Sequence, residues 1–274
     1  MRIIKSLALL SAAVLSTSAH AIRWFEVEII AFKQAPSYSI KEDFSIEPEA
    51  LTERNRLNLL LEGFNHTGYE LCLQGRARFQ DRSFIRTLTQ GKSSPWCEPS
   101  RDYVSLFDTL PLSPSVEPQE HMDSIYLLDK SQLQFQDKLA QLQRKDLQPL
   151  LHTGWRFPEQ SKRRAPNVVI VAGEQYKQPA SITAAINREP LGSLLSPYIS
   201  EETRAAPEFE LQGLIKIHVR HYLYVTTDLD LKYEDEGKLR TARMSQYTRV
   251  YSGDIHYLDH PKIGVIFQIR KYKH

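Results

Sequence analysis

The segment 252–261 carries the side chains whose types and spacing come closest to those of a catalytic or metal-binding site. It places His256, Tyr257, Asp259 and His260 within five positions, and imidazole and carboxylate groups are common zinc ligands and acid–base catalysts. The run Asp-His-Pro at its end is equally typical of a turn between antiparallel strands. Because no third set of ligands and no motif such as His-Glu-x-x-His accompanies the segment, we favour the turn.

A second group of candidates follows the alternating segment 211–231. Its polar positions hold side chains that stack on sugar rings or pair with carboxylates, as a ligand such as peptidoglycan would require. They are Lys216, His218, Arg220, Tyr222 and Tyr224. Alternation alone also places polar residues on the solvated face of a sheet, so an ordinary sheet face is the competing interpretation.

Trp155 and Arg156 raise the same question at another strand. Their side chains are also suited to a glycan ligand. A tryptophan on a strand, however, belongs more often to the core than to a glycan-binding surface, because it buries so much apolar area.

Motifs of the common enzyme classes are missing from the sequence. It contains no Gly-x-Ser-x-Gly nucleophile elbow, no phosphate-binding glycine loop and no dinucleotide-binding fingerprint. We therefore predict that the protein is not an enzyme and has no catalytic residue, cofactor or metal site. The formal net charge is only +2 over 274 residues, which gives no reason to expect nucleic-acid binding.

Residues 1–21 have the features of a secretory signal peptide. Basic residues precede an apolar run at 7–15, and a small-residue triplet ends at Ala21. We expect cleavage after Ala21 and a periplasmic mature protein. The apolar run is half the roughly 20 residues needed to cross a bilayer, and isoleucine rather than cysteine follows the cleavage site, so no membrane anchor is expected.

Cys72 and Cys97 are the only cysteines, and an even number in an exported chain favours an intramolecular disulfide. Closing a loop of this length would stabilise the fold by about 3 kcal/mol, less any strain. A redox pair or a metal pair is the alternative. The two residues are too far apart for a Cys-x-x-Cys motif, and no histidine-rich cluster lies beside them.

Several segments have the composition of regular elements. Strands are expected at 23–32, 149–158, 167–173 and 263–270. The most regular helical pattern begins at Ser131 with a capping-box sequence and continues through Phe135, Leu139 and Leu142 to a basic end at 144–145.

The region 36–118 is predicted to be a loop-rich insertion that the disulfide ties together. Prolines interrupt its short patterns, apart from a possible helical turn at 48–61. Loops of this length are uncommon unless they are functional. A purely protein-binding scaffold that presents this insertion to a partner is therefore one hypothesis for the whole protein.

The clearest pattern is the alternation of apolar and polar residues from 211 to 231. A period of two over this length predicts a strand with a bend or bulge near Gly213 or His221. The acidic turn 233–238 then reverses the chain into 239–252, which predicts a long β-hairpin.

Together these segments predict an α+β protein. We expect an N-terminal α/β lobe with a mixed sheet at 22–175, a connector at 176–208 and a C-terminal antiparallel sheet at 209–274. The C-terminal part would consist of the hairpin and the closing strand, packed with the first lobe as one unit.

Four segments together resemble the CsiV family of periplasmic proteins from gammaproteobacteria. They are Trp24–Ile30 directly after the leader, Leu150–Arg156, His221–Val225, and Gly253–Pro261 before the closing strand. The Ile-His-Tyr-Leu-Asp-His-Pro run in the last of these is the most specific. The likeness covers both ends and the middle of the mature chain and leaves 36–118 unmatched.

The resemblance implies a non-catalytic, peptidoglycan-binding protein that supports cell-wall assembly. Its partners would be peptidoglycan, a bifunctional peptidoglycan synthase and the outer-membrane lipoprotein that activates the synthase. The resemblance supplies no catalytic residues, so the candidates for ligand binding are those proposed from their chemistry above. They include His256, Tyr257 and His260 of the segment 252–261. The alternative from another class is a wall-modifying hydrolase that uses His256, Asp259 and His260.

Overall fold

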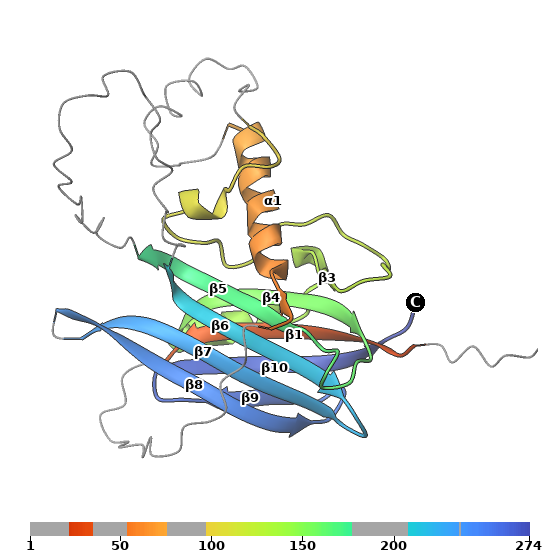
Figure 1. The fold of residues 1–274 in the computed structure, drawn as a ribbon. Coiled ribbons are helices and arrows are strands. Elements are labelled where there is room, and N and C mark those ends of the chain that lie inside the picture. The colour runs from red at the N-terminus through yellow and green to blue at the C-terminus, as the bar shows by residue number, and fades with distance from the viewer. Residues whose placement is uncertain (1–21, 35–53, 76–96, 177–207, 236) are drawn as a thin grey trace, which may run out of the picture.

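The computed structural model describes residues 22–34, 54–75, 97–176, 208–235 and 237–274, and its strands form two sheets packed face to face (Figure 1). The predicted leader, nearly all of the predicted connector, and residues 36–53 and 76–96 of the predicted insertion lie outside the described residues. Of the described helices, none is long and apolar enough to cross a membrane.

The first sheet is antiparallel throughout, with the strand order β3-β4-β1-β10-β9. Its strands are β1 (Trp24–Lys33), β3 (Tyr126–Leu127), β4 (Gln148–Pro158), β9 (Ile255–Asp259) and β10 (Ile263–Tyr272). The strands predicted at 23–32, 149–158 and 263–270 are confirmed. The N-terminal strand β1 lies between β4 and the C-terminal β10, so this sheet joins the two ends of the described chain.

The second sheet is mixed, with the strand order β2-β5-β6-β7-β8. Its strands are β2 (Arg56–Leu57), β5 (Asn167–Tyr176), β6 (Glu208–Val219), β7 (Leu223–Asp235) and β8 (Lys238–Val250). β2 pairs parallel with β5, and the other neighbours pair antiparallel. The strand predicted at 167–173 is confirmed as part of β5.

The prediction of one strand over 211–231 is wrong, because the chain reverses direction within it. β6 and β7 form a hairpin whose three-residue turn, 220–222, is closed by the pair Val219 and Leu223. This turn pairs odd-numbered residues with odd-numbered residues, so the apolar alternation continues through the reversal. The pattern identified the buried face correctly but could not reveal the turn.

The hairpin predicted at the acidic segment is confirmed. β7 and β8 stay paired as far as Asp235 and Lys238. Gly237 in the connection has a φ of +73°, a left-handed conformation that glycine adopts without a steric penalty. Turn chemistry and alternation therefore located this hairpin from local sequence alone.

The core lies between the two sheets and combines inner side chains from both. Buried residues of β1, β4 and β10 form one cluster with those of β5, β6 and β7. The predicted α+β class is confirmed. The chain on either side of the predicted connector contributes strands to both sheets, so the predicted boundary between an N-terminal lobe and a C-terminal sheet does not coincide with the division into sheets.

Helix α1 (Leu59–Leu73) crosses one edge of the two sheets and contacts β5 and β3 (Figure 1). The predicted turn at 48–61 overlaps only its first residues, so the prediction was wrong in extent. Gly63 and Gly68 weaken the helical signal, but tertiary packing requires them. A Cβ on Gly63 would lie 2.5 Å from Leu127, and one on Gly68 would lie 2.3 Å from Tyr103.

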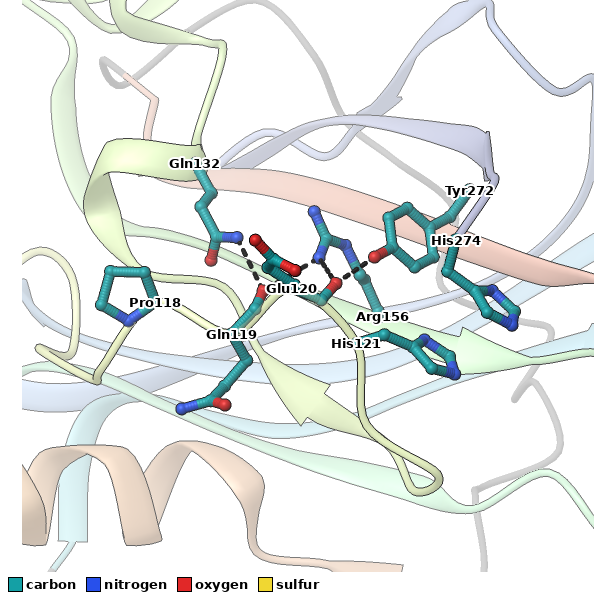
Figure 2. Close-up of a pocket in the computed structure, with 8 residues that line it drawn as sticks. All are labelled: Pro118, Gln119, Glu120, His121, Gln132, Arg156, Tyr272 and His274. Atoms are coloured by element: carbon teal, nitrogen blue, oxygen red, sulfur yellow. Dashed lines mark hydrogen bonds between the residues drawn. The ribbon is translucent and has the colours of Figure 1, made fainter.

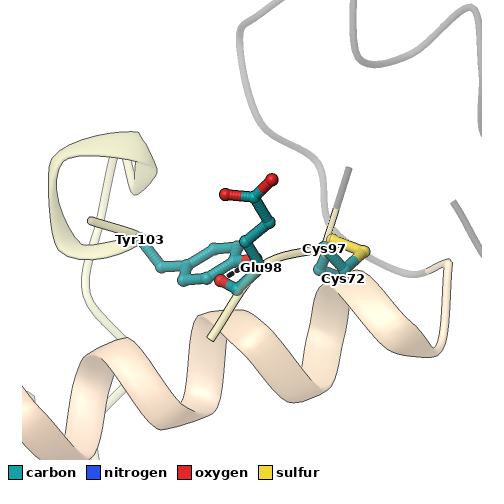
Figure 3. The surroundings of a disulfide bond; sticks show 4 residues. All are labelled: Cys72, Cys97, Glu98 and Tyr103. Atoms are coloured by element: carbon teal, nitrogen blue, oxygen red, sulfur yellow. Dashed lines mark hydrogen bonds between the residues drawn. A yellow bond between two sulfur atoms is a disulfide. The ribbon is translucent and has the colours of Figure 1, made fainter. Parts of the chain in front are cut away.

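The predicted disulfide is confirmed. Cys72 near the end of α1 is bonded to Cys97, with 5.9 Å between their Cα atoms (Figure 3). The bond lies beside the buried Tyr103, whose hydroxyl donates a hydrogen bond of 3.1 Å to the Glu98 carbonyl. The disulfide thus attaches the chain from residue 97 onward to the helix.

Helix α3 (Gln136–Arg144) confirms the predicted helix, but its predicted cap at Ser131 is wrong. The capping box belongs to Asp129 and Gln132, which close a short 3-10 helix (Lys130–Gln132) before it. At the start of α3, the backbone N–H groups of Gln134 and Phe135 donate instead to the Glu28 carboxylate on β1. Helix α3 itself has no side-chain cap hydrogen bond, and its start is instead held on the sheet by a residue 106 positions away.

Candidate functional site

The outer face of the second sheet carries the best-developed candidate site, at the end formed by the β6–β7 turn. Paired residues on neighbouring strands point to the same face of a sheet. His218 on β6 pairs with Tyr224 on β7, which pairs with Arg249 on β8. Lys216 and Tyr247 lie one pairing step along, on the same face. The sheet register therefore gathers these five side chains on one surface.

Aromatic rings on this surface form a continuous stack. The ring of His218 lies 5.1 Å from that of Tyr224 at an angle of 14°, and Tyr224 lies 5.6 Å from Tyr247 at 7°. Exposure increases along the stack, from 5% for His218 to 60% for Tyr247. The buried imidazole supports the rings, and the outermost tyrosine offers a flat apolar face to solvent.

Arg249 joins this stack to two further tyrosines. Its guanidinium carbon lies 4.6 Å from the ring centre of Tyr222 and 5.6 Å from that of Tyr251. Its Nη2 donates a hydrogen bond of 3.2 Å to the Tyr251 hydroxyl. Tyr222 and Tyr251 are 42% and 50% exposed. We refer to Tyr222, Tyr224, Tyr247, Tyr251 and Arg249 as the tyrosine platform.

Positive charge borders the tyrosine platform and shifts the pKa values of its neighbours. Burial lowers the pKa of His218, and the nearby Lys162 and Lys216 lower it further. Burial and Lys162 also lower the pKa of Lys216. His218 is therefore neutral at neutral pH, and the surrounding charge favours an anionic ligand.

The structure brings together all five candidates predicted on the alternating segment. Lys216, His218 and Tyr224 share the outer face, and Arg220 and Tyr222 lie in the adjoining turn. His218 is too buried to contact a ligand directly and instead lies beneath the platform.

Sequence reasoning missed Tyr247, Arg249 and Tyr251, which are three of the five residues of the tyrosine platform. The available signal was their spacing of two residues, which places them on one face of a strand. Because the register of β8 on β7 was unknown, nothing in the sequence connected them with Tyr222 and Tyr224.

Arg156 lies in a different place, beneath a pocket of about 600 Å³ on the outer face of the first sheet (Figure 2). The pocket is lined by Pro118, Gln119, Glu120, His121, Gln132, Arg156, Tyr272 and His274. Arg156 Nη1 donates to the carbonyls of Gln119 and Glu120 at 3.1 and 2.7 Å. Its Nε donates to Glu26 at 2.8 Å. These bonds hold the segment that covers the sheet.

A buried ion network continues from Arg156 below this pocket. Arg270 Nη2 lies 2.7 Å from Glu26 Oε1 and 3.0 Å from Glu28 Oε2, and His152 Nε2 donates to Glu28 at 2.9 Å. Burial alone would raise the pKa of Glu28, but the hydrogen bonds from His152, two backbone N–H groups and Arg270 outweigh it and lower the pKa. Arg156 thus belongs to a structural network.

Trp155 points to the opposite face of β4 from Arg156 and is only 2% exposed. It belongs to the main core cluster. The core interpretation of this residue agrees with its position, and the structure offers it no contact with a glycan.

The segment 252–261 forms the turn and edge strand that its turn composition predicted. His260 and Ile263 exchange backbone hydrogen bonds of 3.1 and 3.2 Å between β9 and β10. His256 faces inward, with its ring 5.4 Å from that of Phe267, whereas Asp259 faces outward and accepts a hydrogen bond of 2.8 Å from the Tyr257 hydroxyl. Burial first, and then Asp259, raise the pKa of Tyr257.

This arrangement does not assemble a hydrolase site from the predicted residues. His256 and Asp259 lie on opposite faces of β9, because residues three positions apart on a strand point in opposite directions. His260 is buried, and its Nδ1 accepts a hydrogen bond of 3.3 Å from the Lys262 N–H. Among the described residues, no group of three His, Cys, Asp or Glu side chains could hold a metal ion.

A family model described as "Peptidoglycan-binding protein, CsiV" matches residues 3–272. The match includes the region 36–118, which the segment-by-segment resemblance had left unmatched. Neither the curated proteins nor the solved structures contain a match to this chain.

Proposed function

The chain belongs to the CsiV family of peptidoglycan-binding proteins, and from this premise we propose that the tyrosine platform is the surface that binds peptidoglycan. The observation that carries this proposal is the row of exposed tyrosines that Arg249 holds together. It is the one described surface that combines flat aromatic faces with a guanidinium group outside any described ion pair.

The proposed binding chemistry follows from these side chains. Tyrosine rings present flat faces to sugar rings, while their hydroxyl groups reach the polar rim of the ligand. Arg249 is positioned to donate hydrogen bonds to a carboxylate or carbonyl next to the stacked sugar. Stacking of His218 on Tyr224 restricts the outer rings before the ligand arrives, which reduces the entropy lost on binding.

We further propose that the protein acts in the periplasm as a non-catalytic adaptor. In this role it would bind peptidoglycan while engaging a bifunctional peptidoglycan synthase and its outer-membrane lipoprotein activator. The family description supports the first half of this role. Residues 1–21 have the features of a leader cleaved after Ala21, which supports the location.

Co-sedimentation with isolated peptidoglycan sacculi tests the location of the site. The double variant Tyr222→Ala/Tyr247→Ala should bind at least about tenfold more weakly, because a central aromatic side chain commonly contributes 1 kcal/mol or more to binding. The matched control is Tyr257→Ala, which removes a tyrosine of similar exposure, 50%, from the other sheet. Equal binding by both variants and the wild type would refute the platform as the site.

The supernatant of the same experiment separates binding from hydrolysis. We expect no released muropeptides. If the purified wild-type protein releases muropeptides and the His260→Ala variant does not, the result would favour the wall-modifying hydrolase instead. If the wild type does not sediment with the sacculi, the protein would instead bind other proteins, which favours the scaffold hypothesis.

A further inference from the structure

The loop between β4 and β5 carries a basic run, Lys162-Arg163-Arg164, whose three side chains are exposed. The loop has a defined conformation. The backbone N–H groups of Arg164 and Ala165 donate to the Ser161 carbonyl at 2.9 Å, and the Asn55 side chain donates to the carbonyls of Arg164 and Ala165 at 3.1 and 3.2 Å. These bonds present the three cations from a fixed turn.

A backbone hydrogen bond places this loop beside the tyrosine platform. The N–H of Val219, the last residue of β6, donates to the Gln160 carbonyl at 2.8 Å. Lys162 is consequently close enough to Lys216 and His218 to disfavour their charged forms. Cations from the loop, from β6 and from the β6–β7 turn therefore border the same end of the sheet.

These cations lack an internal counter-ion. Within the described part of the chain, no carboxylate pairs with Lys162, Arg163, Lys216 or Arg220. Glu159, at the start of the loop, is already bound to Arg23 at 2.7 Å. The sequence as a whole is almost neutral, with 35 basic and 33 acidic residues, so the excess of positive charge is a local feature of this surface.

Beneath these cations lies a buried polar atom that has no hydrogen-bond partner among the described residues. His218 Nδ1 is buried and makes no hydrogen bond to any described group. Burying a polar atom without a partner costs free energy. Lys162 and Lys216 lie near this imidazole and add positive charge without a carboxylate to balance it. Because this arrangement does not stabilise the folded protein, it points to a ligand that supplies the negative charge.

We propose that Lys162, Arg163 and Lys216 form an anion subsite of the tyrosine platform, which binds the carboxylates of the peptidoglycan stem peptides. The inference rests on the proposed function and extends it. The N-acetylated sugars of the glycan strand carry no charge once their lactyl groups are linked to peptides, so the carboxylates of the polymer lie on its peptides. A glycan stacked on the tyrosines would direct those peptides toward the loop.

The consequence is selectivity for glycan strands that carry free carboxylates over strands that carry none. The tyrosines would bind either kind of strand, and the basic loop would add affinity only when carboxylates are present. Because the loop cations are exposed, this added affinity should be screened by salt, whereas stacking should depend on salt much less.

The test compares soluble glycan strands that carry stem peptides with the same strands after an amidase has removed the peptides and the lactyl carboxylates freed by that cleavage have been converted to neutral amides. The purified protein should bind the peptide-bearing strands about fivefold more tightly, the size expected for two exposed ion pairs. Lys162→Ala/Arg163→Ala should lose this preference and bind the bare strands as the wild type does. Raising the salt concentration should abolish the preference in the wild type.

The matched control is Arg144→Ala/Lys145→Ala, which removes two exposed charges from the end of α3 and should keep the preference. If the wild type binds both kinds of strand equally, or if the loop variant keeps the preference, the anion subsite is refuted while the platform proposal survives. If the wild type binds neither kind of strand, the proposed function fails, and the subsite fails with it.

Discussion

Arg156 on the first sheet and Arg249 on the second each place a guanidinium group against a tyrosine ring, 3.9 Å from Tyr272 and 4.6 Å from Tyr222. Arg156 is buried and donates to Glu26 and to two backbone carbonyls. Arg249 is exposed, and within the described chain it has no ion pair. An arginine–tyrosine contact thus indicates a binding surface only where the guanidinium keeps donors available for a ligand.

The difference between the two outer faces arises from what covers them. Helix α3 and the chain before it pack on the first sheet, where Phe135 and Leu142 form a cluster with Ile30 and Phe32. Polar groups enclosed there must find partners within the protein, because a buried unpaired charge is costly. On the second sheet, Tyr247 stays mostly exposed, so its neighbours can meet a ligand.

The largest expected effect is on stability and concerns the buried ion network on the outer face of the first sheet. Glu28→Gln leaves Arg270 and His152 beside a neutral group and weakens the hydrogen bonds that Glu28 accepts from Gln134 and Phe135. Removing one partner of a buried ion pair costs about 3–5 kcal/mol. The free energy of unfolding, measured with denaturant, should therefore fall by about 3 kcal/mol or more.

The control for this prediction is Glu159→Gln, which breaks the exposed pair with Arg23 and should cost less than about 1 kcal/mol. If the two variants lose similar small amounts of stability, the network on the first sheet is not the structural element described above.

Smaller effects are expected when Arg156 or Arg249 is replaced by lysine. The first replacement should affect mainly stability, and the second should affect mainly ligand binding. Lysine keeps the charge but loses the planar group that stacks and donates several bonds at once. Arg156→Lys should lower the unfolding free energy by about 2 kcal/mol, the cost of unsatisfied buried groups. Arg249→Lys should change it by less than about 0.5 kcal/mol while weakening sedimentation with sacculi several-fold.

Measuring unfolding and sedimentation for both variants tests the contrast between the two faces. Loss of sacculus binding in a stable Arg156→Lys protein would place the ligand at the pocket of the first sheet. If Arg249→Lys binds sacculi as the wild type does, the Arg249 guanidinium does not contribute to the proposed site.

The smallest expected effects concern pH, and the two faces respond in different windows. The pKa of His218 lies below its ordinary value of 6.5, so its contribution to stability is complete above about pH 6.5 and is lost as pH falls toward the lowered pKa. The pKa of Glu28 lies below 4.5, so its contribution is complete above about pH 4.5 and is lost only in stronger acid.

Unfolding free energies measured between pH 7 and pH 3 separate these contributions. His218→Phe preserves an aromatic ring next to Tyr224 and should remove the loss that begins as pH falls below 6.5, while keeping the loss below pH 4.5. Glu28→Gln should do the reverse. Identical pH profiles for His218→Phe and the wild type would show that His218 does not titrate as its burial indicates.

Local sequence predicted much of the fold and part of the site. Alternation identified the buried face of β6 and β7, and the acidic turn before Gly237 identified the second hairpin. Cysteine pairing followed from an even number of cysteines in a chain predicted to be exported. Helix α1 was largely missed because Gly63 and Gly68 contradict helix propensity, and the turn at 220–222 was missed because alternation continues through it.

The sequence by itself determined most of the strands, the second hairpin and the disulfide, since strand alternation, turn residues and an even number of cysteines can be read without knowing the fold. Only the tertiary structure decided which polar residues are structural and which are available to a ligand. Glu26 meets Arg156 across 130 positions, and Tyr224 meets Arg249 across a strand pairing that no local pattern specifies. The physical reason is that the burial of a side chain and its partners depend on strand order and register, which are settled when distant segments pack.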